Sequence, residues 1–330
     1  MQHSFSIKKN KLASTRKRLY ESIETFTKNL QTYPITLLDL KIIDASIKEL
    51  CYTAKVFAPY HHRRKVTVFG SARSAASDPS SKQAKKFAEE MVRLGYMIMT
   101  GGGPGIMQAA QEGAGSTGSF GLNIQLPFEQ QPNRIIQGDA KLVNYKYFFT
   151  RKLTMVKESD ALVLFPGGFG TQDELFETLT LLQTGKTTPT PVVCIDKKGD
   201  TYWKEWKKFN FDSLLRRKLI SKDDTHLIHF TSDVNDAIAH ITYFYKNYHS
   251  IRFHHNWLLI RLWRLPPTDD LKKISREFKD IIRKGTIEVA TDDLPYDPDI
   301  EDLAIKTLRF NFDQQSFGKL RLLINTFNRY

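Results

Sequence analysis

Two short apolar runs in the middle of this sequence each lead directly into a glycine-rich stretch. Residues 96–100 run into 101–105, and residues 161–165 run into 166–171. A helical pattern follows each stretch. Glycine lets backbone N–H groups approach an anion closely, and the helix that follows presents its positive end to the same place. Two such turns predict a parallel sheet with an anion-binding cleft at the carboxyl ends of its strands.

The rest of the central region alternates between strand and helix patterns. We expect strands at 66–69, 96–100, 120–124, 161–165, 192–195 and 227–230, and helices at 80–94, 106–114, 151–157, 172–183, 203–219 and 234–248. Alternation of this kind predicts an α/β fold, with a Rossmann-like, doubly wound parallel sheet covered by helices on both faces.

The segments on either side differ from this centre. Residues 1–64 predict a helical, basic N-terminal extension, with a helix over 35–57. Residues 251–330 predict a C-terminal appendage of mixed structure and unknown role, with a helix over 271–283. The aromatic and basic stretch 257–264 is expected to pack against the protein rather than on a membrane surface. The nucleotide-binding domain itself is expected to span residues 65–250.

Charge and composition exclude several classes of protein. The net charge is +13, but residues 1–64 hold 12 basic against 5 acidic residues and 65–250 hold 23 against 19. A mildly basic centre disfavours a nucleic-acid channel. The two cysteines, Cys51 and Cys194, disfavour a disulfide scaffold. We see no signal peptide and no apolar run of the roughly 20 residues that a membrane helix needs, so we expect a cytoplasmic protein.

The known cofactor motifs do not fit the glycine stretches. Ile106 stands where GxGxxG would need its last glycine, and no acidic ribose partner follows at the usual distance. The histidines have no zinc-site spacing. We therefore expect neither a cofactor nor a metal site.

The motifs are specific enough to indicate a family. Residues 101–107 read Gly-Gly-Gly-Pro-Gly-Ile-Met, which is similar to a loop pattern GGG-x-x-G-x-M. Residues 166–174 match PGGxGTxxE, and Arg151-Lys152 forms a pair on a helix between the two motifs. Residues 69–73 match a first strand and loop. Together they resemble the LOG (Lonely Guy) family of nucleotide 5′-monophosphate phosphoribohydrolases, often labelled lysine decarboxylases. The resemblance covers about residues 65–250.

The resemblance implies hydrolysis of the N-glycosidic bond of nucleoside 5′-monophosphates to free base and ribose 5-phosphate. It places Glu174 as the ionised carboxylate and Arg151 as the group that orients it or the substrate. The residues that it places at the nucleotide are Ser71, Arg73, Gly101, Gly102, Gly103, Gly105, Met107, Lys152, Gly167, Gly168, Gly170 and Thr171. We also expect Asn133 and Arg134, in a polar loop, to close over the base. A homodimer or higher homo-oligomer is implied as well.

Other interpretations of these residues remain open. Thr171 and Glu174 have the spacing of a helix capping box, with Thr171 at the N-cap. In that setting Glu174 lies in the first helical turn, which favours its charged form. Arg151 fits an exposed helix arginine equally well. For the whole chain, the alternatives are a non-catalytic nucleotide-binding regulator and, ranked below it, a Rossmann-like module that binds single-stranded nucleic acid.

Overall fold

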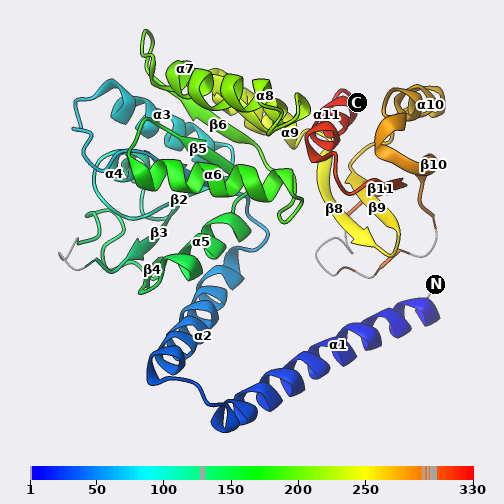
Figure 1. The fold of residues 1–330 in the computed structure, drawn as a ribbon, viewed down its shortest axis with the longest axis horizontal. Coiled ribbons are helices and arrows are strands. Elements are labelled where there is room, and N and C mark those ends of the chain that lie inside the picture. The colour runs from blue at the N-terminus through cyan, green and yellow to red at the C-terminus, as the bar shows by residue number, and fades with distance from the viewer. Residues whose placement is uncertain (1, 127–130, 292–293, 296, 298–302) are drawn as a thin grey trace.

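A computed structural model describes residues 2–126, 131–291, 294–295, 297 and 303–330, with side chains from residue 13 onward. Two sheets organise the chain (Figure 1). The larger has seven parallel strands in the order β4-β3-β2-β1-β5-β6-β7, and the smaller has four antiparallel strands in the order β10-β11-β9-β8. The predicted α/β fold class, with its helical N-terminal and mixed C-terminal additions, is confirmed.

The elements of the seven-stranded sheet alternate as the sequence predicts. They are β1 (Lys65–Phe69), α3 (Pro79–Arg93), β2 (Met97–Thr100), α4 (Ile106–Ala114), β3 (Ser119–Ile124), β4 (Leu142–Tyr145), α5 (Phe148–Lys157), β5 (Ala161–Leu164), α6 (Phe169–Gln183), β6 (Val192–Ile195), α7 (Tyr202–Lys207), α8 (Ser213–Arg216), β7 (Ile228–Thr231) and α9 (Val234–Phe244). Strand order reverses between β1 and β5, which is where a doubly wound sheet opens a crevice.

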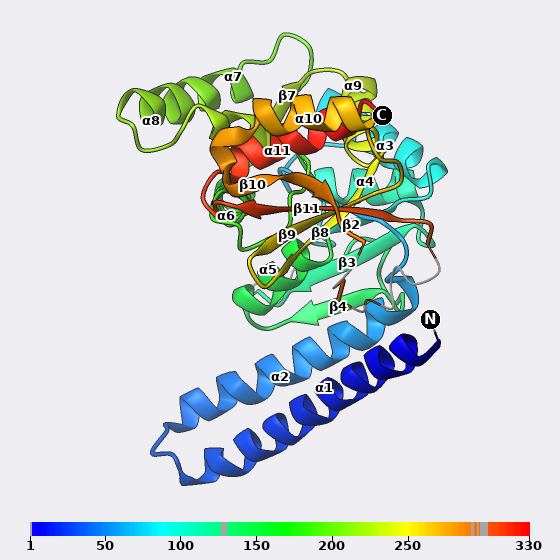
Figure 2. The ribbon, with the colours of Figure 1, turned by 90° about the vertical axis from the view of Figure 1, so that its right-hand side faces the viewer.

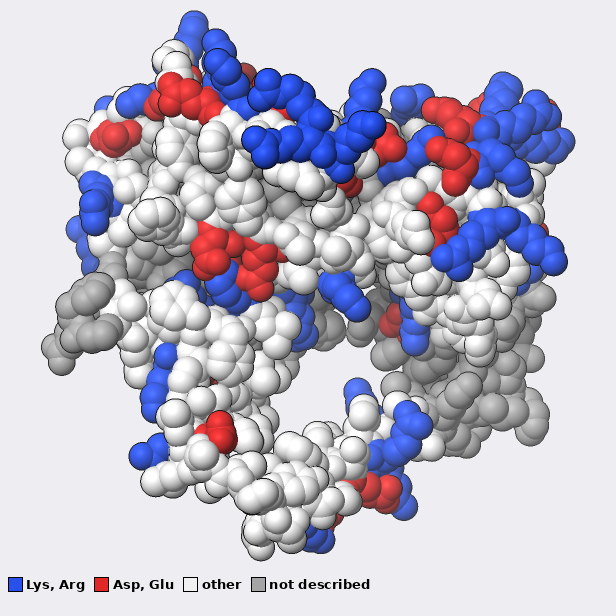
Figure 3. All heavy atoms as spheres, viewed as in Figure 1, with Lys and Arg blue, Asp and Glu red and all other residues white. Residues whose placement is uncertain are grey.

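The N-terminal extension consists of two long helices, α1 (Gln2–Asn29) and α2 (Leu37–Phe57). The axes of the two helices lie nearly parallel in the view of Figure 2. Figure 1, from another side, shows that α1 diverges from α2 beyond the turn that joins them. A capping box of Thr36 and Asp39 begins α2. Figure 3 shows this arm as a projection below the body of the protein.

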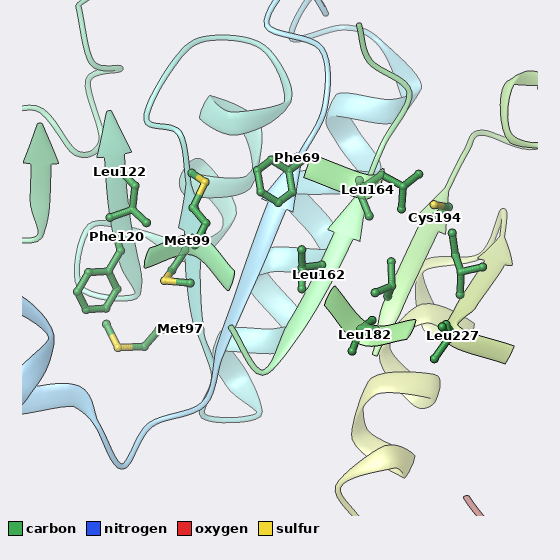
Figure 4. Close-up of a cluster of buried hydrophobic side chains, with 14 of the residues drawn as sticks. Phe69, Met97, Met99, Phe120, Leu122, Leu162, Leu164, Leu182, Cys194 and Leu227 are labelled. Carbon is green, nitrogen blue, oxygen red and sulfur yellow. The ribbon is translucent and has the colours of Figure 1, made fainter. Parts of the chain in front are cut away.

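The sheet is buried on both faces because successive side chains of a strand point to opposite sides. On β2, Met97 and Met99 face the layer of α2, α5, α6 and α7, while Ile98 faces the layer of α3, α4 and α9. Figure 4 shows part of the first layer, with Phe69, Met99 and Leu164 on three neighbouring strands. Burial on both faces explains why the strands are short, continuous apolar runs.

Several predicted boundaries are wrong in informative ways. Strand β4 was not predicted, and α6 begins at Phe169 rather than at Gln172. The helix expected over 203–219 is broken: α7 ends at Lys207, a π-helical segment spans Lys208–Asp212, and α8 follows. The helix expected over 234–248 stops at Phe244, because residues from Tyr248 onward form the first strand of the second sheet.

The C-terminal region folds as an antiparallel sheet covered by two helices. It comprises β8 (Tyr248–His254), β9 (Trp257–Leu262), α10 (Thr268–Glu277), β10 (Ile282–Val289), β11 (Lys306–Phe312) and α11 (Phe317–Phe327). The predicted packing of the 257–264 stretch is confirmed, since Leu258, Ile260 and Leu262 are fully buried in this unit. The helix expected over 271–283 ends at Glu277, because residues from Ile282 onward form a strand.

The division of the chain at residues 64 and 250 stays a prediction. None of the described helices is long and apolar enough to cross a membrane.

Helices α9 and α11 join the two units through a buried polar contact. The guanidinium of Arg321, 3% exposed, donates from Nη2 to Nε2 of His240 at 3.1 Å and lies 3.9 Å from the centre of the Phe244 ring. The His240 ring stacks on that of His229, whose Nε2 lies 2.7 Å from Asp236. Burial, aided by the charge of Arg321, lowers the pKa of His240 to about 3. His240 is therefore a neutral acceptor.

This contact predicts a pH dependence of folding. Between the ordinary histidine pKa of about 6.5 and the lowered value, the unfolded chain binds a proton that folded His240 does not, so the free energy of unfolding falls as the pH falls. For His240 the loss at pH 5 is about 2 kcal/mol. His249, whose pKa burial lowers to about 4, adds to the same slope. Urea denaturation at several pH values from 7 to 5 gives the free energy of unfolding as a function of pH. This free energy should fall less steeply with falling pH in His240→Gln, which keeps a hydrogen-bond acceptor but cannot titrate. Equal slopes would contradict this prediction.

Candidate active site

A cavity of about 680 Å³ opens where β2, β1 and β5 end. Its size is typical of a small-molecule site. Its lining residues are Phe69, Gly70, Ser71, Ala72, Arg73, Gly101, Met107, Arg151, Met155, Gly167, Gly168, Phe169, Gly170, Thr171, Gln172 and Glu174. The structure thus brings together most of the predicted site residues. Those that lie outside the lining are Gly102, Gly103, Gly105 and Lys152.

The first glycine loop is held against the loop after β1. Gly105 has a φ of +69°, and a Cβ there would lie 2.3 Å from the carbonyl oxygen of Ser71. The backbone N–H of Ile106 donates to that same oxygen at 3.0 Å. Gly105 therefore allows the close approach of two backbones, while Gly101 and Met107 reach the cavity.

Asn133 holds the first glycine loop by hydrogen bonds and does not close over a base. It is buried, and its Nδ2 donates to the carbonyl oxygens of Gly102 and Gly103 and to the side chain of Gln111. Arg134 is exposed and pairs with Glu112 at 2.9 Å. The role that we expected for Asn133 is wrong, because an asparagine with its amide hydrogens directed at backbone carbonyls inside the protein cannot also cover a ligand. The role expected for Arg134 stays a prediction.

The second glycine loop ends at the start of α6. Its N-cap is Gly168, and no side chain caps the helix there. A Cβ on Gly167 would lie 2.2 Å from Oγ1 of Thr171, whereas a Cβ on Gly168 or Gly170 would meet nothing within 4 Å. Gly168 and Gly170 thus leave open space in the cavity in front of the positive end of a 15-residue helix. Such a place suits an anion.

The predicted capping box is absent. Because α6 begins at Phe169, Thr171 and Glu174 lie inside the helix, and neither Glu174 oxygen has a hydrogen-bond partner. Glu174 also lies beyond the first turn, so the stabilisation of its charge that we expected from that turn does not apply. Glu174 is 2% exposed and lines the cavity. A structural role as a cap is therefore excluded for this carboxylate.

The charge of Glu174 is balanced by two cations of α5. Its Oε1 lies 3.7 Å from Nη2 of Arg151, and its Oε2 lies 3.5 Å from Nζ of Lys152. Lys152 also contacts Asp173 at 2.8 Å and Glu177 at 2.5 Å. Burial raises the pKa of Glu174, and the charges of Lys152 and Arg151 oppose that rise. The site thus holds a poorly solvated carboxylate whose ionisation depends on two neighbours.

The two cations themselves differ in position. Arg151 is not the exposed helix arginine of the alternative interpretation: its side chain is 14% exposed, its Nε is buried without a partner, and it lines the cavity. Burial lowers its pKa. Lys152 turns its ammonium toward the carboxylates of α6. Arg151 therefore lines the cavity, whereas Lys152 pairs with the carboxylates of α6.

Sequence reasoning missed some of the lining residues, which are Phe69, Gly70, Ala72, Met155, Phe169 and Gln172. Most lie next to predicted residues, but Gln172 belongs to a network that the sequence does not reveal. Its Nε2 donates to the hydroxyl of Tyr202 at 2.5 Å, and its Oε1 accepts from Nε1 of Trp206 at 2.7 Å. The Tyr202 hydroxyl donates in turn to the carbonyl of Gly167. Helix α7 thereby fixes the second glycine loop.

Comparisons with known proteins find relatives of part of this chain. Residues 105–241 match the family model described as possible lysine decarboxylase. A probable cytokinin riboside 5′-monophosphate phosphoribohydrolase, LOGL1 of Oryza sativa subsp. japonica, is 30% identical over 135 residues, which are 40% of this chain and 60% of that protein. Cytokinin riboside 5′-monophosphate phosphoribohydrolase LOG1 of Arabidopsis thaliana is 25% identical over 215 residues, which are 64% of this chain and 97% of that protein.

Among solved structures, the molybdenum cofactor carrier protein of Chlamydomonas reinhardtii is similar at 24% identity and a TM-score of 0.38, over 55% of this chain and 96% of that one. The chain spans about three fifths of the length of the rice relative that it matches. The resemblance that the glycine motifs predicted is confirmed by the family model and the plant relatives.

Proposed function

We propose, from the resemblance of this chain to the LOG family and from the geometry of its cavity, that the protein hydrolyses the N-glycosidic bond of nucleoside 5′-monophosphates. The products are a free base and ribose 5-phosphate. The observation that carries the proposal is the buried carboxylate of Glu174, which lines the cavity and whose two oxygens form ion pairs but accept no hydrogen bond. Buried polar groups are normally hydrogen-bonded, so a carboxylate without a hydrogen bond beside a cavity points to a ligand that supplies one.

The 5′-phosphate is proposed to bind at the start of α6. The open space before Gly168 and Gly170, the positive end of the helix and the hydroxyl of Thr171 together form an anion site. Arg73, in the loop after β1, faces the same cavity. A single phosphate needs only a few such groups, in keeping with the mildly basic centre of the chain.

The ribose is proposed to lie over Glu174. Cleavage of a glycosidic bond develops positive charge at the anomeric carbon, and an ionised carboxylate nearby stabilises it. In this proposal the bond between the anomeric carbon and the base nitrogen breaks, and water forms the new bond to that carbon. Glu174 takes the proton that the water loses and passes it on to the departing base, which restores the carboxylate. Arg151 orients the carboxylate or the substrate with its rigid set of donors. The apolar lining of Phe69, Met107 and Met155 then remains for the base.

The ionisation of Glu174 gives this proposal a specific pH dependence. Burial raises its pKa and Lys152 lowers it, so Lys152→Met removes a favourable charge and raises that pKa further. The carboxylate must be ionised to act. The acid limb of kcat/KM is therefore expected to move to higher pH in Lys152→Met, with a several-fold loss at pH 6 and a smaller loss at pH 8. The control is Lys157→Met, an exposed lysine of the same helix. An acid limb at the same pH in both variants would refute the assigned role of Lys152.

An assay for released base separates the proposed hydrolase from a non-catalytic regulator. Incubation with a panel of nucleoside 5′-monophosphates, followed by chromatography, detects free base only if the bond is cleaved. A regulator would bind the nucleotide, as measured by calorimetry, and leave it intact.

A further inference from the structure

The first helix of the arm exposes an apolar stripe. Leu19, Ile23 and Phe26 are 54%, 61% and 48% exposed, and no side chain of residues 13–29 is buried. Their spacing of four and three residues places them on one face of α1, as in the seam of a coiled coil. We call these three residues the α1 stripe.

The second helix carries a stripe with the same periodicity. Leu40, Ile47 and Leu50 are exposed, half-buried Ile43 lies between them, and the spacing is three, four and three residues. The same face continues to Phe57, which is buried and stacks on Phe120 at 4.4 Å between ring centres. The end of α2 is thus anchored to the body, while the preceding turns leave Leu40, Ile47 and Leu50 exposed and Ile43 half-buried. We call these four residues the α2 stripe.

The turn between the helices keeps the two stripes of one chain apart. A 3-10 turn spans Leu30–Thr32, the N–H of Ile35 donates to the carbonyl of Tyr33 at 2.8 Å, and the Thr36–Asp39 capping box fixes the start of α2. Figure 1 shows α1 diverging from α2 after this turn. On the arm in Figure 3, long uncharged stretches separate the charged side chains. Closure of α1 onto its own α2 would require this hydrogen-bonded turn to rearrange.

A helix without tertiary contacts is marginally stable in water, because most helical stability in proteins comes from packing one apolar face. We propose that the α1 stripe of one copy packs on the α2 stripe of a second copy, and reciprocally, so that two chains form a two-fold dimer by exchange of α1. One symmetric assembly then covers both stripes of both chains. Helix α1, at 28 residues, is long enough to span the 21 residues of α2. The two contacts would bury on the order of 1,000 Å², close to the lower end for specific interfaces.

Cross-linking between different chains tests this arrangement directly. Cys51 is exposed and Cys194 is buried, so a Cys51→Ser background offers no accessible thiol. Into it we would place one cysteine on the α1 stripe (position 19, 23 or 26) in one sample and one on the α2 stripe (position 40, 47 or 50) in another. The two samples are then mixed and oxidised. At least one combination of an α1-stripe variant with an α2-stripe variant is expected to give a disulfide-linked species that contains both chains. Thr25→Cys, which lies off the stripe on the same helix, should give none.

The mass of the full chain gives the second measurement. We expect a dimer by analytical ultracentrifugation, at least tenfold weakened by Ile23→Asp and unchanged by Thr25→Asp, which adds the same charge to an exposed position of α1. A monomer at 100 µM, a dimer indifferent to Ile23→Asp, or the absence of a linked species from every mixed pair would each overturn the exchange of α1.

Discussion

Replacement of Glu174 by glutamine is expected to lower kcat/KM for base release by roughly 10³-fold. Among the described residues that line the cavity Glu174 is the only acidic one, and its charge is proposed to stabilise the developing cation of the ribose. Glutamine has nearly the same shape and lies within the same helix. No capping hydrogen bond is lost, since α6 begins at Gly168 and Phe169 rather than at Thr171. The circular dichroism spectrum of the variant should therefore match that of the unsubstituted protein.

The matched control for this change is Glu112→Gln. Glu112 is also a partly buried carboxylate in ion pairs, with Arg134 and Lys85, but it lies outside the cavity. It should leave kcat/KM within about twofold of the unsubstituted protein, since surface ion pairs contribute little. Full activity of Glu174→Gln would remove the carboxylate from the mechanism and with it the proposed role of this cavity in hydrolysis.

A large loss of stability is expected when Gly105 is replaced. Alanine there would occupy a backbone conformation that only glycine adopts easily and would place its Cβ 2.3 Å from the carbonyl oxygen of Ser71. The atoms that this Cβ would meet, in Ser71 and Ala72, are backbone atoms, so the loop after β1 and the first glycine loop must separate. We expect Gly105→Ala to lower the free energy of unfolding by about 3 kcal/mol and to lower activity, because Ser71 lines the cavity.

Gly115 is the control that separates the cost of the positive φ from the cost of the close contact. Its φ is +68°, nearly that of Gly105, but a Cβ there would meet nothing within 4 Å. Gly115→Ala should cost about 1 kcal/mol from backbone conformation. Urea denaturation of both variants measures the difference. Equal losses would show that the close approach of Gly105 and Ser71 contributes nothing to stability.

Much of the fold could be predicted because both faces of the sheet are buried. Each central strand then becomes a short apolar run, as in β5 and β6, and each helix shows one apolar face. Strand β4 escaped prediction because it lies at the edge of the sheet, where Leu142 is only half-buried and Asn144 is exposed. The C-terminal sheet escaped because the helical pattern of α10 continues across Phe278 and Ile282, so that periodicity alone cannot separate the helix from β10.

The site was predictable where chemistry depends on local sequence. Gly101, Gly168 and Gly170 follow directly from the two glycine stretches. The positions of Asn133 and Lys152 depend on contacts between segments far apart in the chain, with Gly103 in one case and Glu177 in the other. The capping box failed for a local reason: Phe169 and Gly170 already adopt helical conformation, which moves the start of α6 ahead of Thr171.

Release of free base from nucleotides is the most direct test of the proposed function. The 330-residue chain would be incubated with AMP, CMP, GMP, UMP and IMP, and the products separated by chromatography. We predict that at least one nucleotide yields free base and ribose 5-phosphate in equal amounts, and that Glu174→Gln yields neither. Binding of these nucleotides without release of base from any of them would contradict the hydrolase and favour a protein that only senses nucleotides.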